Sequence, residues 1–156
     1  MSAADHMRAA LALAQQKMES GSGGPFGAVI VRGNRVIAQG WNQVTSANDP
    51  TAHAEIGAIR AACAAEGNFS LAGCEIYTSC EPCPMCLAAI YWARLDRVYY
   101  ANSRADAARI GFDDDFIYRE IPLAIERRRL PMTRLLAEEA HAAFEAWERK
   151  PDKIRY

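Results

Sequence analysis

Residues 75–94 read EIYTSCEPCPMCLAAIYWAR and contain the change of pattern that decides the fold. The run Glu75–Ser79 mixes β-branched and aromatic residues and predicts a short strand. Three cysteines follow within seven residues, and Pro84–Arg94 then predicts a helix with proline at its start. Arg97–Ala101 predicts another strand. A strand, a helix and a second strand in this order predict two parallel strands joined by a crossover helix.

The chain upstream continues this alternation. Apolar residues at spacings of three and four predict an amphipathic helix over residues 5–20. The runs Phe26–Val31 and Arg35–Trp41, separated by a glycine-containing turn, predict a β-hairpin. A further helix is expected to begin at a Thr51 cap and to stop at Gly67.

Downstream, an acidic loop is expected at Gly111–Asp115, a last strand at Met132–Leu136 and a final helix at Leu136–Arg149. Five strands alternating with helices predict an α/β fold in layers. No repeat, low-complexity linker or internal boundary interrupts the chain, so residues 1–156 are predicted to form one domain.

The composition is that of an ordinary soluble domain, with 156 residues, 51% hydrophobic and 24% charged. A net charge of -1 disfavours a nucleic-acid partner, which usually requires a strongly basic chain. Residues 127–129, three consecutive arginines, are interpreted as a solvated or subunit-facing patch. The longest apolar run, Leu87–Ala93, is too short to span a membrane, so no membrane partner is expected.

The five cysteines favour metal or thiol chemistry in a reducing cytoplasm over a disulfide framework, because three of them are clustered and no secretory signal pattern precedes them. Cys63 and Cys74 are expected to be small buried hydrophobes.

Two segments carry candidate chemistry, DPTAHAE at residues 49–55 and TSCEPCPMC at residues 78–86. One histidine, His53, and two thiolates, Cys83 and Cys86, supply the three protein ligands of a catalytic zinc ion and leave one position for water. Cysteines three apart at a helix start lie on one face, and the helix N-terminus favours their thiolate form. His53 and Glu55 are two residues apart, so both can serve one site only if the metal lies beyond the helix end. Glu55 is then the candidate general acid and base.

Other interpretations of these residues remain open. An isolated C-x-x-C pair is also typical of a redox site or half of a structural zinc site. A structural site would need a fourth strong ligand, and Cys80, expected at the strand end beneath the site, is the nearby candidate. A non-catalytic zinc protein in which Glu55 has no role is therefore a second hypothesis. The H-x-E and P-C-x-x-C motifs together are the signature of zinc deaminases.

With these motifs the chain resembles the cytidine deaminase superfamily and, within it, the small bacterial guanine deaminases. The resemblance rests on Gly23–Val31, Asn42, Asn48–Glu55, Tyr77–Cys86, Ile90–Arg94, Gly111–Asp114 and Tyr156. The zinc motifs indicate only the superfamily, whereas the Gly-Phe-Asp-Asp loop, Trp92 and Tyr156 favour guanine as the substrate.

The resemblance implies a three-layer fold with a central mixed five-stranded sheet and helices on both faces. It implies one zinc ion per chain on His53, Cys83 and Cys86, and hydrolysis of guanine to xanthine and ammonia by a zinc-bound hydroxide, with Glu55 as the proton shuttle. Asp114 would recognise guanine and assist proton transfer.

For the substrate, the resemblance implies that Asn42 and the backbone N–H of Ala54 bind the base. Phe26 and Trp92 would sandwich its ring, and Tyr156 would close the pocket. Each of these residues also has an ordinary structural interpretation, as a core aromatic, a turn residue or a chain terminus.

The resemblance further implies a cytoplasmic homodimer in purine salvage or catabolism, whose C-terminal segment, about residues 137–156, is exchanged between subunits. Two alternative activities stay open: a tRNA adenosine deaminase, which shares the stretch before Glu55, and a deaminase of another aminated heterocycle such as a triazine.

Overall fold

A four-stranded sheet in the order β2-β1-β3-β4 is the centre of the computed structural model, which describes residues 1–156. The strands are β1 (Gly27–Arg32), β2 (Arg35–Trp41), β3 (Cys74–Cys80) and β4 (Arg97–Asn102). β1 runs antiparallel to both β2 and β3, and β3 runs parallel to β4. The predicted hairpin, the mixed sheet and the parallel pair around the cysteine motif are therefore confirmed.

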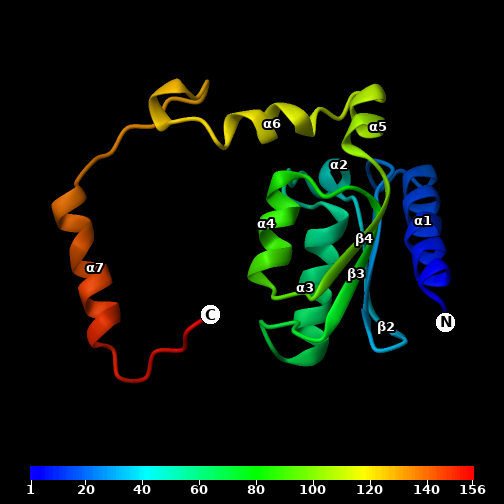
Figure 1. Ribbon diagram of the computed structural model, residues 1–156, viewed down its shortest axis with the longest axis horizontal. Helices are drawn as coiled ribbons and strands as arrows, with labels where there is room; N and C mark the ends of the chain where they lie inside the picture. The colour runs from blue at the N-terminus through cyan, green and yellow to red at the C-terminus, as the bar shows by residue number, and fades with distance from the viewer. The chain divides into compact units, whose positions relative to one another are not determined.

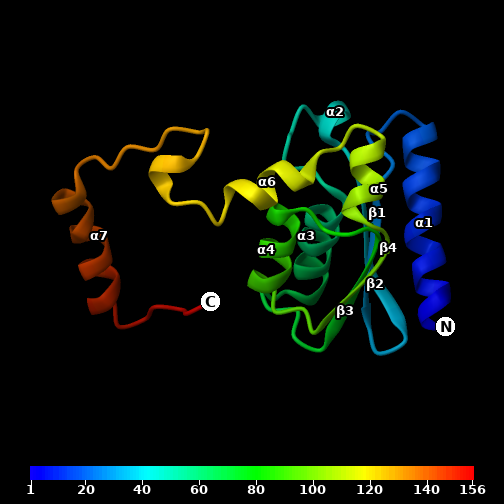
Figure 2. The same ribbon diagram turned by 45° about the horizontal axis from the view of Figure 1, so that its top comes forward.

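Helices cover both faces of this sheet. The helices are α1 (Ala3–Glu19), α2 (Val44–Ala47), α3 (Ala54–Glu66), α4 (Pro84–Trp92), α5 (Arg104–Arg109), α6 (Asp114–Glu120), the short 3-10 helix η1 (Ile125–Arg127) and α7 (Ala137–Arg149). α1 packs on one face of the sheet, while α3 and α4 form a layer on the other (Figures 1 and 2). The three-layer α/β prediction is confirmed.

The alternation of side chains along β1 divides the core into two parts. Ala28 and Ile30 face α3 and α4, whereas Val29 and Val31 face α1. Successive strand residues point to opposite faces, so a fully apolar strand contributes to both layers. This pattern buries the central strands and places their ends at the edges of the sheet, where the candidate site residues lie.

The start of α3 differs from the prediction. Thr51 does not cap this helix: its hydroxyl and backbone N–H donate to the carboxylate of Asp49 at 2.7 and 2.8 Å. His53 occupies the N-cap position instead. The end was predicted correctly, since Gly67 terminates α3 with a left-handed φ of +61°, which glycine adopts readily.

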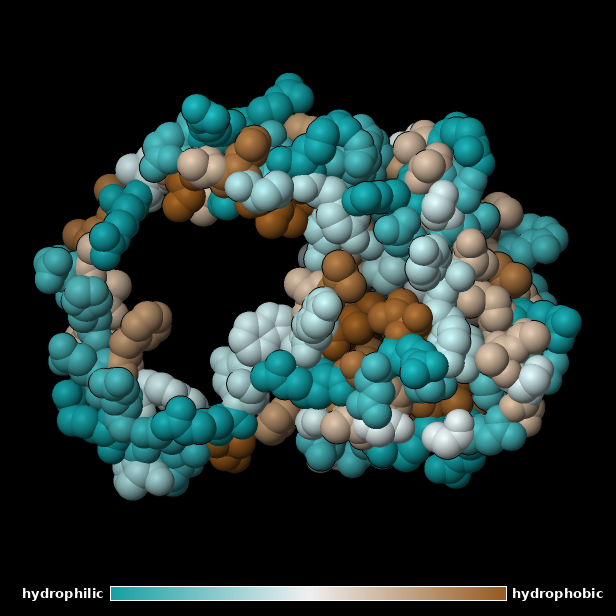
Figure 3. All heavy atoms as spheres, viewed as in Figure 1, coloured by the Kyte–Doolittle hydropathy of each residue, from teal (hydrophilic) through white to brown (hydrophobic).

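The chain divides into two units, Met1–Tyr118 and Arg119–Tyr156. Residues 119–156 contain η1 and α7 and no buried residue. Apolar residues of this unit lie among its polar surface residues (Figure 3). Leu130, Leu135, Leu136, Phe144 and Ile154 are each more than two thirds exposed.

The predicted fifth strand at Met132–Leu136 is wrong, because these residues have no secondary structure and no neighbouring strand to pair with. None of the helices combines the length and the apolar character that crossing a membrane requires.

Candidate metal centre and active site

The site is built at the first turns of α3 and α4. His53 has an extended backbone, with φ of −74° and ψ of 158°, and its side chain makes no capping hydrogen bond to α3. The imidazole therefore projects beyond the helix end. This is the geometry that the two-residue spacing between His53 and Glu55 required.

Cys83 has the corresponding position at α4. It is the N-cap residue, with φ of −65° and ψ of 167°, and Pro84 follows in the first turn, where its missing N–H is not needed. The sulfur of Cys83 accepts a hydrogen bond from the backbone N–H of Cys86 at 3.5 Å. This contact places the two cysteine side chains on the same side of the helix start.

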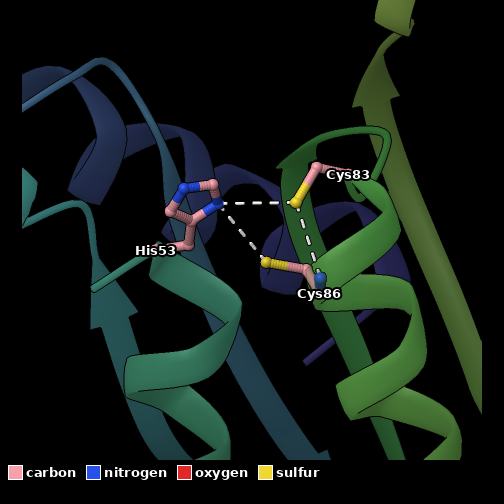
Figure 4. A group of neighbouring side chains, drawn as sticks. All are labelled: His53, Cys83 and Cys86. Atoms are coloured by element: carbon pink, nitrogen blue, oxygen red, sulfur yellow. Dashed lines mark hydrogen bonds between the residues drawn. The ribbon is translucent and has the colours of Figure 1, made fainter. Parts of the chain in front are cut away.

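His53, Cys83 and Cys86 converge on one point between the two helix ends (Figure 4). The Nδ1 atom of His53 lies 3.5 Å from each cysteine sulfur, and all three candidate ligand atoms lie within 4.8 Å of one another. Zinc bonds of about 2.0–2.1 Å to nitrogen and 2.3 Å to sulfur, at tetrahedral angles, place ligand atoms about 3.6 Å apart. The donor set and its spacing therefore fit zinc.

The three groups also influence each other's ionisation. Hydrogen bonds from Cys86 and His53 lower the pKa of Cys83. For Cys86, the hydrogen bond to Cys83 and burial raise the pKa. The hydrogen bond with Cys83 raises the pKa of His53. The three groups therefore interact closely, and a bound divalent cation would favour the ionised form of both thiols.

Glu55 lies beside this cluster and is only 6% exposed. Its Oε1 atom accepts a hydrogen bond from the hydroxyl of Thr78, a buried residue of β3, at 3.1 Å. Burial raises the pKa of this carboxyl group. A carboxyl held by a neighbour and biased toward its protonated form suits a group that accepts and returns a proton.

A pocket of about 450 Å³ opens over the cluster. It is lined by Gly24, Phe26, Asn42, Val44, Thr45, Pro50, His53, Glu55, Cys80, Glu81, Cys83, Phe112 and Asp114. This volume is within the range of small-molecule sites. Its lining combines two aromatic rings with polar groups close to the three candidate ligands.

Asn42 is fixed in one orientation at the pocket wall. Its Oδ1 atom accepts hydrogen bonds from the backbone N–H groups of Gly24 at 3.1 Å and of Val44 at 3.2 Å. Asn42 is 6% exposed. Because its oxygen is used by the backbone, its NH2 group is the part that remains to donate to a ligand.

The structure brings together most of the predicted site residues. Phe26, Asn42, Glu55 and Asp114 line the pocket with the metal cluster, and Ala54 is the buried first residue of α3. Asp114 is the first residue of α6, where burial and the nearby Cys83 raise the pKa of its carboxyl group.

Trp92 and Tyr156 are placed differently from this group. Trp92 is the last residue of α4, at the end opposite Cys83, and is 62% exposed. Tyr156 belongs to the second unit and is 74% exposed.

The ring that packs against Phe26 is Phe112, with centroids 4.9 Å apart in an edge-to-face arrangement. From the sequence, Phe112 is placed in the acidic loop and no role is predicted for it. An aromatic residue directly between Gly111 and two aspartates was the signal that could have identified it. Cys80 ends β3 beneath the site as predicted and lines the pocket without joining the metal cluster.

Comparison with known proteins agrees with this geometry. Residues 1–102 match the model of the cytidine and deoxycytidylate deaminase zinc-binding region. The chain belongs to the cytidine and deoxycytidylate deaminase family. Zinc is accordingly its cofactor, and the cluster at the starts of α3 and α4 fits that ion.

Within this deaminase family, the chain is 51% identical to a guanine deaminase of Bacillus subtilis over 150 residues, 96% of each chain. The X-ray structure of a guanine deaminase from Bacillus subtilis superposes with a TM-score of 0.97 at 49% identity, covering 100% of this chain and 99% of that one. A tRNA-specific adenosine deaminase of Agrobacterium fabrum is 53% identical over 76 residues, 49% of this chain and 50% of that protein. A tRNA-specific adenosine deaminase of Buchnera aphidicola covers 80% of this chain at the lower identity of 36%. The guanine deaminase of Bacillus subtilis combines 51% identity with 96% coverage.

Proposed function

We propose that this protein is a zinc-dependent guanine deaminase that hydrolyses guanine to xanthine and ammonia. The observation that carries the proposal is the 51% identity to a guanine deaminase over 96% of both chains. The pocket supports it, because aromatic rings, an oriented amide and three carboxyl groups, those of Glu55, Glu81 and Asp114, line it beside the three-residue candidate metal cluster.

When bound, zinc supplies Lewis acidity that activates water for attack on the amine-bearing carbon of the base. Glu55 would accept one proton from the attacking water and give it to a ring nitrogen of the base. It would then carry the remaining hydroxyl proton of the adduct to the amine, so that the carbon–nitrogen bond breaks and ammonia leaves. Thr78 keeps the carboxyl group of Glu55 in place through its 3.1 Å hydrogen bond. Asp114, at the pocket edge, recognises the base and assists proton transfer to the departing amine.

The base is held by its faces and its edges. Phe26 and Phe112 form an aromatic corner for the flat ring. The NH2 group of Asn42 donates to an acceptor on the base. The backbone N–H of Ala54 lies in the first turn of α3, where N–H groups have no partner within the helix, and it also donates to the base.

We further propose that the protein is a cytoplasmic homodimer and that residues 1–156 act as one deaminase domain with an exchanged C-terminal segment. The absence of any buried residue in 119–156 supports this, because a helix such as α7 normally needs an apolar surface to pack on. In such a dimer, the exposed Trp92 and Tyr156 complete the pocket of one copy or the other. Five free cysteines support a reducing compartment.

Ammonia release by the zinc-loaded protein tests the activity. Guanine, adenine, cytosine, cytidine and an unmodified tRNA are supplied in parallel, with Asp114→Ala as the matched variant. We expect rapid release from guanine alone, and a large loss in Asp114→Ala with zinc content unchanged. Deamination of the tRNA with no reaction on guanine would replace this proposal by the tRNA adenosine deaminase alternative.

A further inference from the structure

The acidic loop that brings Asp114 to the pocket is attached to the metal-binding turn through Tyr118. Tyr118 lies four residues after Asp114 in α6, so the two side chains share one face of the helix. The hydroxyl of Tyr118 donates a hydrogen bond to the backbone carbonyl of Pro82 at 2.7 Å. Pro82 directly precedes Cys83, and the bond therefore connects α6 to the residue that carries a candidate metal ligand.

A second set of contacts supports the ring of Tyr118. The guanidinium group of Arg104 lies 4.6 Å from the centroid of this ring, within the range of a cation–π contact. The backbone N–H of Arg104 donates to Oε2 of Glu81 at 2.9 Å, and its Nε atom lies 3.9 Å from Oε1. Glu81 in turn donates its backbone N–H to the carbonyl of Asn102 at 2.8 Å.

These contacts form a closed ring, since Glu81 and Pro82 are neighbours in the sequence. Glu81 contacts Arg104, Arg104 contacts Tyr118, and Tyr118 contacts Pro82. The contacting residues belong to the β3–α4 turn, the start of α5 and the middle of α6. The turn that holds Cys83 and the helix that begins with Asp114 are thereby linked in one small unit.

We propose that Tyr118 is a positioning residue that holds Asp114 over the metal centre. This inference rests on the proposed function, in which Asp114 contacts the base. Burial of one side of α6 cannot fix this helix, because no residue of α6 is fully buried. A hydrogen bond to a backbone carbonyl next to Cys83 supplies the fixed point instead.

Tyr118→Phe tests this role, because it removes the hydroxyl and leaves the ring in place under Arg104. We expect kcat/KM for guanine to fall about 3- to 10-fold, the effect of one hydrogen bond, with zinc content unchanged. Tyr100→Phe, which removes the hydroxyl of a tyrosine that is 54% exposed on β4, is the matched control and should match the wild type.

A double-mutant cycle with Asp114→Asn separates positioning from general stability. If Tyr118 acts through Asp114, adding Tyr118→Phe to Asp114→Asn causes no further loss. Equal fold-losses in both backgrounds, an unchanged kcat/KM in Tyr118→Phe alone, or a loss of zinc in that variant would each overturn the inference.

Amide hydrogen exchange of residues 112–118 gives a readout that does not depend on the substrate. We expect faster exchange there in Tyr118→Phe than in the wild type and in Tyr100→Phe. If the wild type fails to deaminate guanine, the proposed function falls while this measurement still decides whether Tyr118 holds α6. Unchanged exchange in this segment would contradict the positioning role.

Discussion

Glu55 is the residue whose environment most clearly separates a catalytic zinc site from a structural one. It is buried and accepts a hydrogen bond from Thr78, and Glu55→Gln retains an oxygen for that bond and nearly the same volume. Because an amide cannot take up and return the proton, we expect kcat to fall by about 10²–10⁴-fold. Steady-state kinetics together with zinc content per chain provide the measurement.

Glu66→Gln, at the opposite end of the same helix, is the control and should keep its activity. A Glu55→Gln variant with wild-type turnover would remove this carboxyl group from the mechanism. The non-catalytic zinc protein would then become the better hypothesis.

For single residues, the sequence predicted which side chains gather at the site better than it predicted their local hydrogen bonds and ring contacts. The candidate ligand set and Glu55 were proposed from residue type and spacing, because few side chains bind zinc or shuttle protons, and the structure places these residues together. The prediction that Thr51 caps α3 was wrong because its hydroxyl donates a hydrogen bond to the carboxylate of Asp49 instead. The residue types alone do not show which of these two hydrogen bonds Thr51 forms. The partner of Phe26 was missed because the contact with Phe112 joins residues 86 positions apart.

The contact between β2 and α3 depends on two facing glycines, Gly40 and Gly57. A Cβ atom on Gly40 would meet the backbone carbonyl of Ala54 and the backbone nitrogen of Ala58, which cannot move aside without shifting α3. A Cβ atom on Gly57 would have Gly40 as its nearest neighbour, at an ordinary 3.7 Å. The two positions should therefore respond oppositely to the same substitution.

We expect Gly40→Ala to lower the free energy of unfolding by about 1–3 kcal/mol through overpacking. Gly57→Ala should raise it by about 0.5–1 kcal/mol, because alanine is the better helix former. Urea unfolding of both zinc-loaded variants measures the difference. Destabilisation of similar size in both would contradict the close approach of β2 to α3.

The capping box of α1 gives a pH-dependent contribution at the scale of one helix. Hydrogen bonds from the backbone N–H and the hydroxyl of Ser2 lower the pKa of Asp5 below 3.8. A carboxyl whose pKa is lower in the folded state stabilises the fold above the unfolded pKa, and this contribution disappears as the pH falls through the folded value.

Asp5→Asn should therefore be less stable than the wild type at pH 6, and this difference should shrink below about pH 3.8. Urea unfolding at pH 6, 4 and 3 provides the comparison. A difference that stays constant with pH would assign the effect to packing rather than to charge.

Periodicity correctly predicted the helices and strands around the motifs, but the fifth strand that it predicted at Met132–Leu136 is absent. Met132–Leu136 contains apolar residues, but a strand requires a neighbour whose backbone can pair with it. Pairing is a property of the folded arrangement, and residues 119–156 offer no such neighbour of their own.

For the molecule as a whole, the exposed apolar residues of 119–156 support the proposed homodimer. Phe144 of α7 is 78% exposed, which is unfavourable for an aromatic side chain that remains in water. In a homodimer with an exchanged C-terminal segment, Phe144→Ser should cost about 2 kcal/mol per subunit and shift the protein toward monomer. Sedimentation equilibrium over a range of concentrations measures this shift.

Glu145→Ser, which changes the neighbouring exposed residue and its ion pair with Arg149, is the control and should leave the association unchanged. If both variants sediment like the wild type, α7 does not take part in the dimer. A wild-type protein that stays monomeric at all concentrations would contradict the homodimer itself.

Two of the three candidate metal ligands are also the boundary residues of helices. His53 and Cys83 are separated by 30 residues, and each occupies the N-cap of its helix. An ion that joins them closes this loop and binds only when both helices begin at the correct residue, so its binding free energy adds to that of folding. The affinity for zinc therefore depends on the correct folding of the first turns of α3 and α4. Any substitution that frays either first turn, however distant from the substrate, should therefore weaken zinc binding.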